Sequence, residues 1–315
     1  PHQIIKRSSM KTKRINLKLV VLGAMMVPFF SFGQYNKCAA QNVITESVEE
    51  TFYDAVQKKE VKRRVEKPVA SDSYGNAQGN QYDLAVDGAF EGQTVAVLHL
   101  YTGEGFDFEL PKSALKEKGF SVYRWINNAP DIKEFKKGLD KACQLWIISD
   151  SYSKLSAEHV EAIKAFFDSG KGVYIWGDNQ PYYADANIVA KALIGVEMQG
   201  NTMGAKVVNL QTENNKVGLI PNHLISTGIQ NIYEGITIAT LDYSQDLTPL
   251  IYGSANNLVT AAYEKNGKRL ILDGGFTRLY VNWDSAGTGR YVKNAAAWLV
   301  NYEKFGNEVV SEKMK

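Results

Sequence analysis

Apolar runs alternate with amphipathic runs from about residue 93 onward, and this alternation predicts βαβ units. Residues 94–101 are apolar on both faces, as expected of a parallel strand that is buried on both sides of its sheet. We predict further strands at 121–126, 144–149 and 171–176, and helices at 108–118, 131–141, from the Ser156 cap to Gly170, and at 184–194. This order predicts an α/β fold, a flavodoxin-like doubly wound, mostly parallel sheet between two helical layers.

The second half of this region carries shorter strand patterns, at 205–210, 236–241, 248–252, 258–264 and 269–272. Asn266-Gly267 between the last two predicts a tight hairpin turn. A final helix is predicted at 289–302, with its inward face formed by Val292, Ala295, Ala296 and Leu299.

Residues 34–92 are polar and broken by turn-forming residues. We predict a charged helix at 47–64, then a linker rich in Ser, Asp, Gly, Asn and Gln at 70–81. The leader has no apolar periodicity with which to join a core, so we expect residues 93–303 to form the domain and 304–315 a tail.

The N-terminus has the pattern of an export signal. A positive stretch after Met10 precedes an apolar run that is shorter than the roughly 20 residues of a membrane span. Small residues at 31 and 33 predict cleavage of the signal before Gln34. Residues 1–9 lie upstream of the signal, and we expect no transmembrane span after cleavage. Lys37 is a poor match to a lipidation site at Cys38, so a lipid anchor is not favoured. The other cysteine, Cys143, is predicted to be free and semi-buried.

The charge distribution excludes nucleic acid as a partner. Six of the 36 lysines and arginines lie in residues 1–33, which contain no acidic residue, and the other 30 face 34 acidic residues, a net charge of −4. A mildly acidic body without a basic arm lacks the electrostatic footprint of a nucleic-acid-binding protein.

Three segments carry a family resemblance: 155–179 (LSAEHVEAIKAFFDSGKGVYIWGDN), 181–195, and 268–299 (KRLILDGGFTRLYVNWDSAGTGRYVKNAAAWL). Together they resemble the class I glutamine amidotransferase-like superfamily, in its non-amidotransferase branch of trehalose-utilisation-type proteins and von Willebrand A-associated modules. The resemblance implies a functional edge at the carboxyl ends of the strands. Active members place a cysteine in the turn after the strand equivalent to 173–176, where this chain has Gly177-Asp178-Asn179. Cys143 lies at the amino end of its predicted strand, so glutamine hydrolysis by the family route is excluded.

Polar clusters follow four predicted strands, at 102–104, 150–152, 177–180 and 273–278. Because ligands bind beyond the carboxyl ends of parallel strands, we predict a ligand site formed by Asp178, Asn179, Asp150, Asp273, Thr277 and Arg278. The alternative interpretation is turn chemistry, since Asp and Asn bond their own backbone. Arg278, Trp283 and Arg290 present either an anion-binding or stacking surface, or solvated charges and core packing.

Candidate catalytic groups are few. His99 lies in a buried strand and is interpreted as a core residue, whereas His223 follows Pro221-Asn222 in a loop with the exposure of a general base. No zinc-ligand spacing is present, and the turn at 101–105 lacks the Walker lysine and the dinucleotide fingerprint, so neither metal nor cofactor is predicted. We predict an exported, non-catalytic module that binds a small polar ligand, a glycan or a protein partner. The alternative is a hydrolase that uses Asp178 with assistance from His223.

Overall fold

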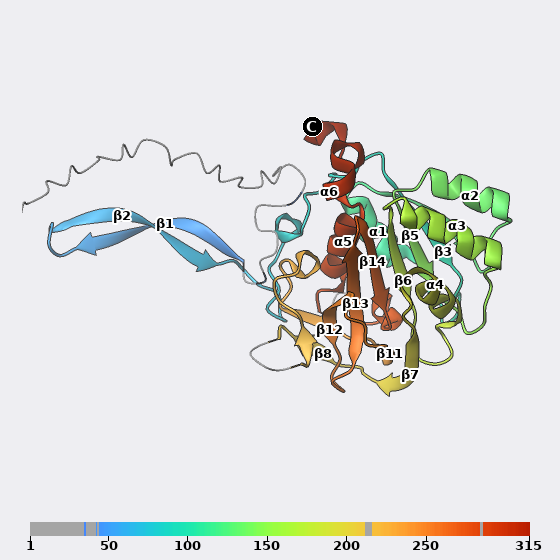
Figure 1. The fold of residues 1–315 in the computed structure, drawn as a ribbon. Helices are drawn as coiled ribbons and strands as arrows, with labels where there is room; N and C mark the ends of the chain where they lie inside the picture. Colours follow the sequence, from blue (N-terminus) through green and yellow to red (C-terminus); the bar gives the residue numbers. More distant parts are fainter. Residues whose placement is uncertain (1–34, 36–41, 43, 212–215, 284–285) are drawn as a thin grey trace, which may run out of the picture. The chain divides into compact units, whose positions relative to one another are not determined.

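A mixed sheet forms the centre of the computed structural model, which describes residues 35, 42, 44–211, 216–283 and 286–315 (Figure 1). Within these residues the sheet has eight strands in the order β4-β3-β5-β6-β14-β13-β12-β9. The first five strands are parallel to their neighbours and the remaining pairs are antiparallel. The strands are β3 (Thr94–His99), β4 (Ser121–Ile126), β5 (Gln144–Ile148), β6 (Gly172–Trp176), β9 (Gly218–Leu219), β12 (Leu247–Tyr252), β13 (Leu258–Lys265) and β14 (Lys268–Asp273).

Helices cover both faces of the sheet, which gives three layers (Figure 1). Alternate residues of β6 point to opposite faces: Tyr174 and Trp176 pack in one core with residues of α1 and α5, and Val173 and Ile175 pack in the other with α2, α3 and α4. The doubly wound, mostly parallel αβα fold predicted from the sequence is confirmed. The helices are α1 (Glu109–Glu117), α2 (Ile132–Asp140), α3 (Ala157–Asp168), α4 (Ala184–Ile194), α5 (Thr288–Leu299) and α6 (Tyr302–Phe305), with short 3₁₀ turns η1 (Asn80–Tyr82), η2 (Leu224–Ser226), η3 (Phe276–Leu279), η4 (Gly306–Val309) and η5 (Glu312–Met314).

Local signals placed several boundaries correctly. Ser156 caps α3 through a hydrogen bond from the backbone N–H of His159. Asn266 and Gly267 join β13 to β14 with φ angles of 54° and 68°, the left-handed conformation that a two-residue hairpin turn requires. The predicted terminal helix is shorter than expected, because it ends at Leu299 and the chain restarts as α6.

Two small sheets flank the main one, formed by β7 (Met198–Met203) with β11 (Thr237–Leu241), and by β8 (Val207–Asn209) with β10 (Asn231–Tyr233). The patterns at 205–210 and 236–241 predicted β8 and β11. The strands β7, β9 and β10 were not predicted, since they are short or polar and have no clear alternation.

The predicted helix at 47–64 is wrong. These residues form an antiparallel hairpin of β1 (Thr45–Asp54) and β2 (Lys59–Pro68), drawn in blue in Figure 1. Val48 pairs with Val65, and Phe52 with Val61, so β-branched and aromatic residues alternate with charged ones at the strand period of two. The high charge content of the segment concealed this period.

The expectation that the leader stays outside the core is also wrong. Leu84, Ala89 and Phe90 are fully buried in the core that contains α1 and α5. Asp83 is buried as well and forms ion pairs with Lys118 at 2.8 Å and with two cations of α5, Arg290 at 2.7 Å and Lys293 at 2.9 Å. Residues 83–90 are therefore integral to the fold, so the core begins before the predicted domain limit near 93, and the limit near 303 stays a prediction.

The predicted signal segment, its cleavage point and Cys38 lie outside the described residues, so export stays a prediction. No helix in the described part of the chain is long and apolar enough to cross a membrane. Cys143 is free and buried beside the amino end of β5.

Candidate functional site

A cavity of about 200 Å³ lies at the carboxyl ends of the parallel strands. Tyr101 follows β3, Ser149 follows β5, Asp178 follows β6 and Thr277 follows β14, so four strand ends contribute to one pocket. This is the edge at which ligands bind in doubly wound proteins, beside the switch point between β3 and β5. The lining residues are Tyr101, Glu104, Ser149, Asp178, Asn179, Tyr182, Ile236, Thr237, Phe276, Thr277 and Tyr280.

A tight turn after β6 places Asp178 in this cavity. The backbone N–H of Gly177 donates to the carbonyl of Asp273 at 2.9 Å, and that of Asp178 donates to the carbonyl of Tyr182 at 3.2 Å. A Cβ atom at position 177 would collide with the Met198 sulfur and come within 3.0 Å of the Tyr183 Cβ, so a larger residue there would displace the Met198 side chain. The turn therefore holds Asp178 at a fixed position beneath the opening.

Asp178 is the group with the most unusual electrostatics in the pocket. Only 6% of the residue is exposed, and its Oδ1 atom has no hydrogen-bond partner among the residues that the structure describes. Burial raises the pKa of Asp178 to about 8; Asp273 and Glu104 act in the same direction, and the Asn179 N–H and Arg278 oppose them. At neutral pH the side chain is therefore mainly a neutral carboxylic acid, which can both donate and accept a hydrogen bond.

Aromatic side chains form one wall of the pocket. The ring of Tyr101 packs edge-on against Tyr182 and Phe276, with centroid distances of 5.5 and 5.3 Å. The Tyr280 hydroxyl donates to Oε2 of the exposed Glu104 at 3.3 Å. Burial raises the pKa of Tyr101 to about 12, so its hydroxyl keeps its proton. The wall therefore combines ring faces with hydroxyl groups. The sequence analysis did not predict Tyr182 and Tyr280 as site residues, although both follow strand ends and could have been found by that position.

Asn179 and Thr277 also line the pocket, but their side chains hold the surrounding loops. The Thr237 hydroxyl donates to Asn179 Oδ1 at 2.8 Å, and the Ile236 N–H donates to Thr277 Oγ1 at 2.8 Å. Both residues therefore tie β11 and its preceding loop to the strand ends, and Asn179 keeps an amide group beside Asp178.

The predicted ligand roles of Asp273 and Arg278 do not fit the structure. Both residues are fully buried and form an ion pair at 2.5 Å beneath the pocket, outside its lining. The Tyr174 hydroxyl donates to Asp273 at 3.1 Å, and Arg278 donates to the carbonyls of Tyr233 and Glu234. This cluster fixes the floor of the site and leaves no group free for a ligand.

Asp150 lies outside the pocket as well. It forms an ion pair with Lys154 at 2.7 Å and accepts a hydrogen bond from the Ser151 N–H at 2.6 Å. Burial raises the pKa of Asp150, but Lys154 and Ser151 outweigh it and hold the pKa below its usual range. Asp150 therefore differs from Asp178 in charge state, although both follow neighbouring strands.

His223 cannot assist Asp178. Its Nδ1 accepts the Ile225 N–H at 3.1 Å, and its ring packs edge-on against Trp298 at 5.5 Å. Burial and nearby Arg269 lower the pKa of His223 to about 4. Arg269 lies at the amino end of β14, whereas Asp178 lies beyond the carboxyl ends of the strands. The exposed base predicted for this loop is therefore a half-buried residue remote from the site.

The predicted anion-binding or stacking surface of Arg278, Trp283 and Arg290 is not present. Trp283 is buried, and Arg290 pairs with Asp83 while donating to the carbonyls of Gly79 and Gly228. The core-packing alternative for these residues is correct.

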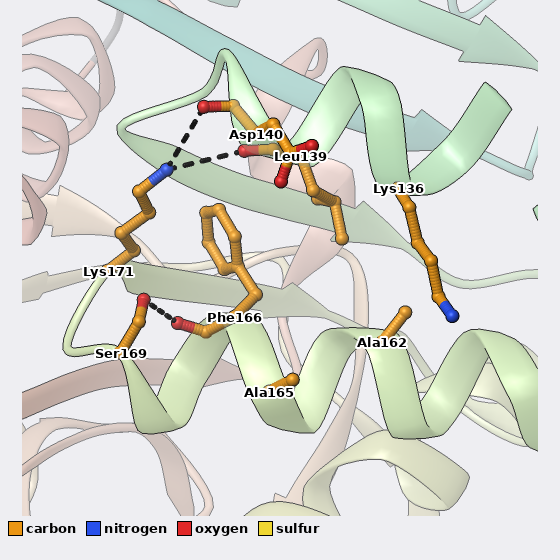
Figure 2. Close-up of a pocket in the computed structure, with 8 residues that line it drawn as sticks. All are labelled: Lys136, Leu139, Asp140, Ala162, Ala165, Phe166, Ser169 and Lys171. Atoms are coloured by element: carbon orange, nitrogen blue, oxygen red, sulfur yellow. Dashed lines mark hydrogen bonds between the residues drawn. The ribbon is translucent and has the colours of Figure 1, made fainter. Parts of the chain in front are cut away.

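A second hollow, of about 450 Å³, lies between α2 and α3 (Figure 2). Lys171 crosses one end of it, with its Nζ atom 3.4 Å from the carbonyls of Leu139 and Asp140, and Ser169 donates to the carbonyl of Phe166 at 2.6 Å. None of its lining residues carries a buried polar atom that lacks a partner within the described part of the chain. The strand-end pocket is therefore the better candidate site.

No protein-family model and no curated protein matches the chain. Among solved structures, it is similar to a GMP synthase-type protein from Thermoplasma acidophilum, with 11% identity, a TM-score of 0.44, and coverage of 69% of this chain and 98% of the other. A ThuA-like protein from Parabacteroides merdae has 11% identity, a TM-score of 0.43 and coverage of 67% and 90%. The glutaminase domain of Trypanosoma brucei CTPS has 9% identity, a TM-score of 0.35 and coverage of 67% and 94%. These likenesses concern the fold alone, and the superfamily resemblance suggested by the sequence and its branch stay predictions.

Proposed function

We propose that this chain is an exported binding module whose strand-end pocket holds a small uncharged ligand rich in hydroxyl groups, such as one sugar unit of a glycan. The observation that carries the proposal is Asp178, a buried carboxyl that lines a cavity and whose Oδ1 atom lacks a partner within the described part of the chain. An unpaired buried polar atom costs free energy, so a ligand hydroxyl that bonds to it would bring a net gain.

The composition of the pocket supports a neutral ligand. Its described lining residues include carboxyl, amide and hydroxyl groups but no lysine or arginine, so none of them balances the charge of a phosphate or carboxylate ligand. Aromatic rings such as Tyr101 offer apolar faces for the C–H groups of a sugar ring. The volume of about 200 Å³ is below the roughly 300–1,000 Å³ of drug-sized pockets, which suits a single ring.

Calorimetric titration tests the proposal, with neutral monosaccharides compared against their uronic acid and amino-sugar counterparts. We expect the neutral sugars to bind and Asp178→Ala to weaken that binding by about tenfold, the value of one lost hydrogen bond. Asp178→Asn mimics the neutral acid, since an amide also donates and accepts, so it should retain binding. Wild-type binding should weaken above about pH 8, where Asp178 ionises, and the Asn variant should not show this decline.

Asp150→Asn is the matched control, because it makes the same change just outside the pocket and should leave affinity unaltered. Absence of binding by every neutral sugar, or an equal loss in the Asp150 and Asp178→Ala variants, would refute the proposal.

Acid–base hydrolysis by two carboxyl groups is the second candidate function. Neutral Asp178 and the exposed Glu104 line the same pocket, and one protonated carboxyl beside a solvated one is the arrangement that divides acid and base roles in hydrolases. His223 has no part in this version. Chromogenic aryl glycosides separate the two candidates: turnover that disappears in Asp178→Asn while sugar binding remains would favour hydrolysis, and binding without turnover would favour the module.

A further inference from the structure

The β1–β2 hairpin has one face on which apolar residues alternate with charges. Residues that pair across the two strands share a face, and successive residues of a strand alternate between faces. We call the face that contains Val48, Phe52, Val61 and Val65 the valine face. It is completed by three cross-strand pairs of opposite charge, Glu46 with Lys67, Glu50 with Arg63, and Asp54 with Lys59.

Charge is strictly divided on the valine face. Every charged residue that β1 contributes is acidic, and every charged residue that β2 contributes is basic. The opposite face has no such order: Tyr53 is its one aromatic residue, and acidic and basic residues occur together on its β2 half. The valine face therefore combines two apolar cross-strand pairs, on either side of the charged Glu50/Arg63 pair, with a defined charge polarity.

Nothing in the described part of the chain pairs with this hairpin. Its strands form a separate two-stranded sheet, and the hydrogen bonds and ion pairs of residues 45–68 run within the hairpin, apart from the backbone link at its base. Phe52, the largest apolar residue of the valine face, is 40% exposed. A two-stranded hairpin alone is marginally stable in water, so a packing partner on this face would stabilise it.

We propose that the valine face is a homodimer interface, in which two hairpins stack face to face about a two-fold axis parallel to their strands. This axis places β1 of one copy over β2 of the other at the same height along the strands. Each residue then lies over the partner copy of its own cross-strand neighbour: Glu46 over Lys67, Glu50 over Arg63, and Phe52 over Val61. Every facing charge pair is of opposite sign, including Glu50 and Arg63 at the middle, and the apolar residues form two layers on either side of them in a four-stranded sandwich.

The other face-to-face arrangement is unfavourable. In it, the two-fold axis is perpendicular to the strands and parallel to the plane of the sheet, which places β1 of one copy over β1 of the other. Acidic residues would then face acidic residues, and basic residues would face basic ones. The charge division therefore selects one symmetry axis, and the resulting contact is isologous and closes at two copies.

The size of the face sets the expected strength. Ten residues per strand extend about 33 Å, and two strands are about 10 Å wide, which gives roughly 300 Å² per copy. This is well below the area of a standard stable interface, roughly 800 Å² per partner, so the dimer is weak and sensitive to salt.

Sedimentation velocity on the full chain, over micromolar to millimolar concentrations, tests the proposal. We expect a concentration-dependent monomer–dimer equilibrium that shifts toward monomer at high salt. The basic variant, Glu46→Lys/Glu50→Lys/Asp54→Lys, should be monomeric, as should the acidic variant, Lys59→Glu/Arg63→Glu/Lys67→Glu. A mixture of the two should dimerise, and the chain that carries all six exchanges should recover the homodimer, because both restore opposite charges across the interface.

Adjacent aromatic residues provide a control that leaves the charges intact. Phe52→Thr removes the largest apolar side chain of the valine face from both copies and should raise the dissociation constant about tenfold or more. Tyr53→Thr makes the equivalent change on the opposite face, where the residue is 68% exposed, and should leave the constant unchanged.

Three results would overturn the proposal: a wild-type chain that is monomeric at every concentration, charge variants whose mixture fails to associate, or an equal effect of the Phe52 and Tyr53 substitutions. A monomer whose Phe52 is nonetheless protected from solvent would assign the valine face to a different segment of the same chain.

Discussion

Replacing Asp178 by asparagine should change how the stability of the fold depends on pH. The pKa of this carboxyl rises from an ordinary value of 3.8 to about 8 in the folded protein, mainly because the group is buried. An acid whose pKa is raised by folding contributes no penalty below about pH 4, where both states hold the proton. Between about pH 4 and 8 the unfolded chain has lost this proton and the folded chain keeps it, so folding becomes progressively less favourable.

The magnitude follows from the size of the shift. One pKa unit corresponds to about 1.4 kcal/mol, so a rise of about four units lowers the free energy of unfolding by on the order of 5 kcal/mol by pH 8. Asparagine does not titrate, so the variant should lack this component. The free energy of unfolding of Asp178→Asn, relative to wild type, should therefore increase by roughly 1.4 kcal/mol per pH unit over this range.

Guanidinium unfolding at a series of pH values measures both curves, and their difference removes the contributions of all other groups. Asp150→Asn is a suitable control, because the pKa of Asp150 is lowered in the folded protein and its stabilising contribution is instead lost as the pH falls. Parallel curves for wild type and Asp178→Asn between about pH 4 and 8 would show that Asp178 is ionised when folded, and a neutral acid in the pocket would be refuted.

Two further predictions concern the scaffold. Removal of residues 1–68 should leave cooperative denaturant unfolding intact. Removal of residues 1–90 also deletes buried Leu84 and Phe90, so it should lower the free energy of unfolding by roughly 5 kcal/mol or more; equal stability of the two truncations would contradict this. Arg278→Met should lower the free energy of unfolding by about 3–5 kcal/mol, because Asp273 is left as an unpaired buried charge. Adding Asp273→Leu should recover most of this loss. A double variant no more stable than the single one would argue against an ion-pair effect.

The amino-acid sequence determined the layered architecture and the location of the site. Strands such as β4 and helices such as α4 were predicted with their observed limits, because a continuous apolar run or an amphipathic period is a local signal that the sheet then uses. The turn at Asp178 was placed correctly for a similar reason, since the carboxyl ends of parallel strands necessarily meet at one edge.

Only the tertiary structure decided what the polar residues at that edge do. Asp150, Asp178 and Asp273 all follow strands and look alike in sequence, yet one pairs with Lys154, one lies unpaired in the pocket and one is buried against Arg278. The charge partners of Asp150 and Asp273 are only four and five residues away in the chain, but burial depends on residues far away, and burial together with these partners sets whether a carboxyl is charged, neutral or unavailable. The same non-local packing placed residues 83–90 in the core and left the hairpin with an unpaired face, because those outcomes depend on which surfaces the rest of the fold presents.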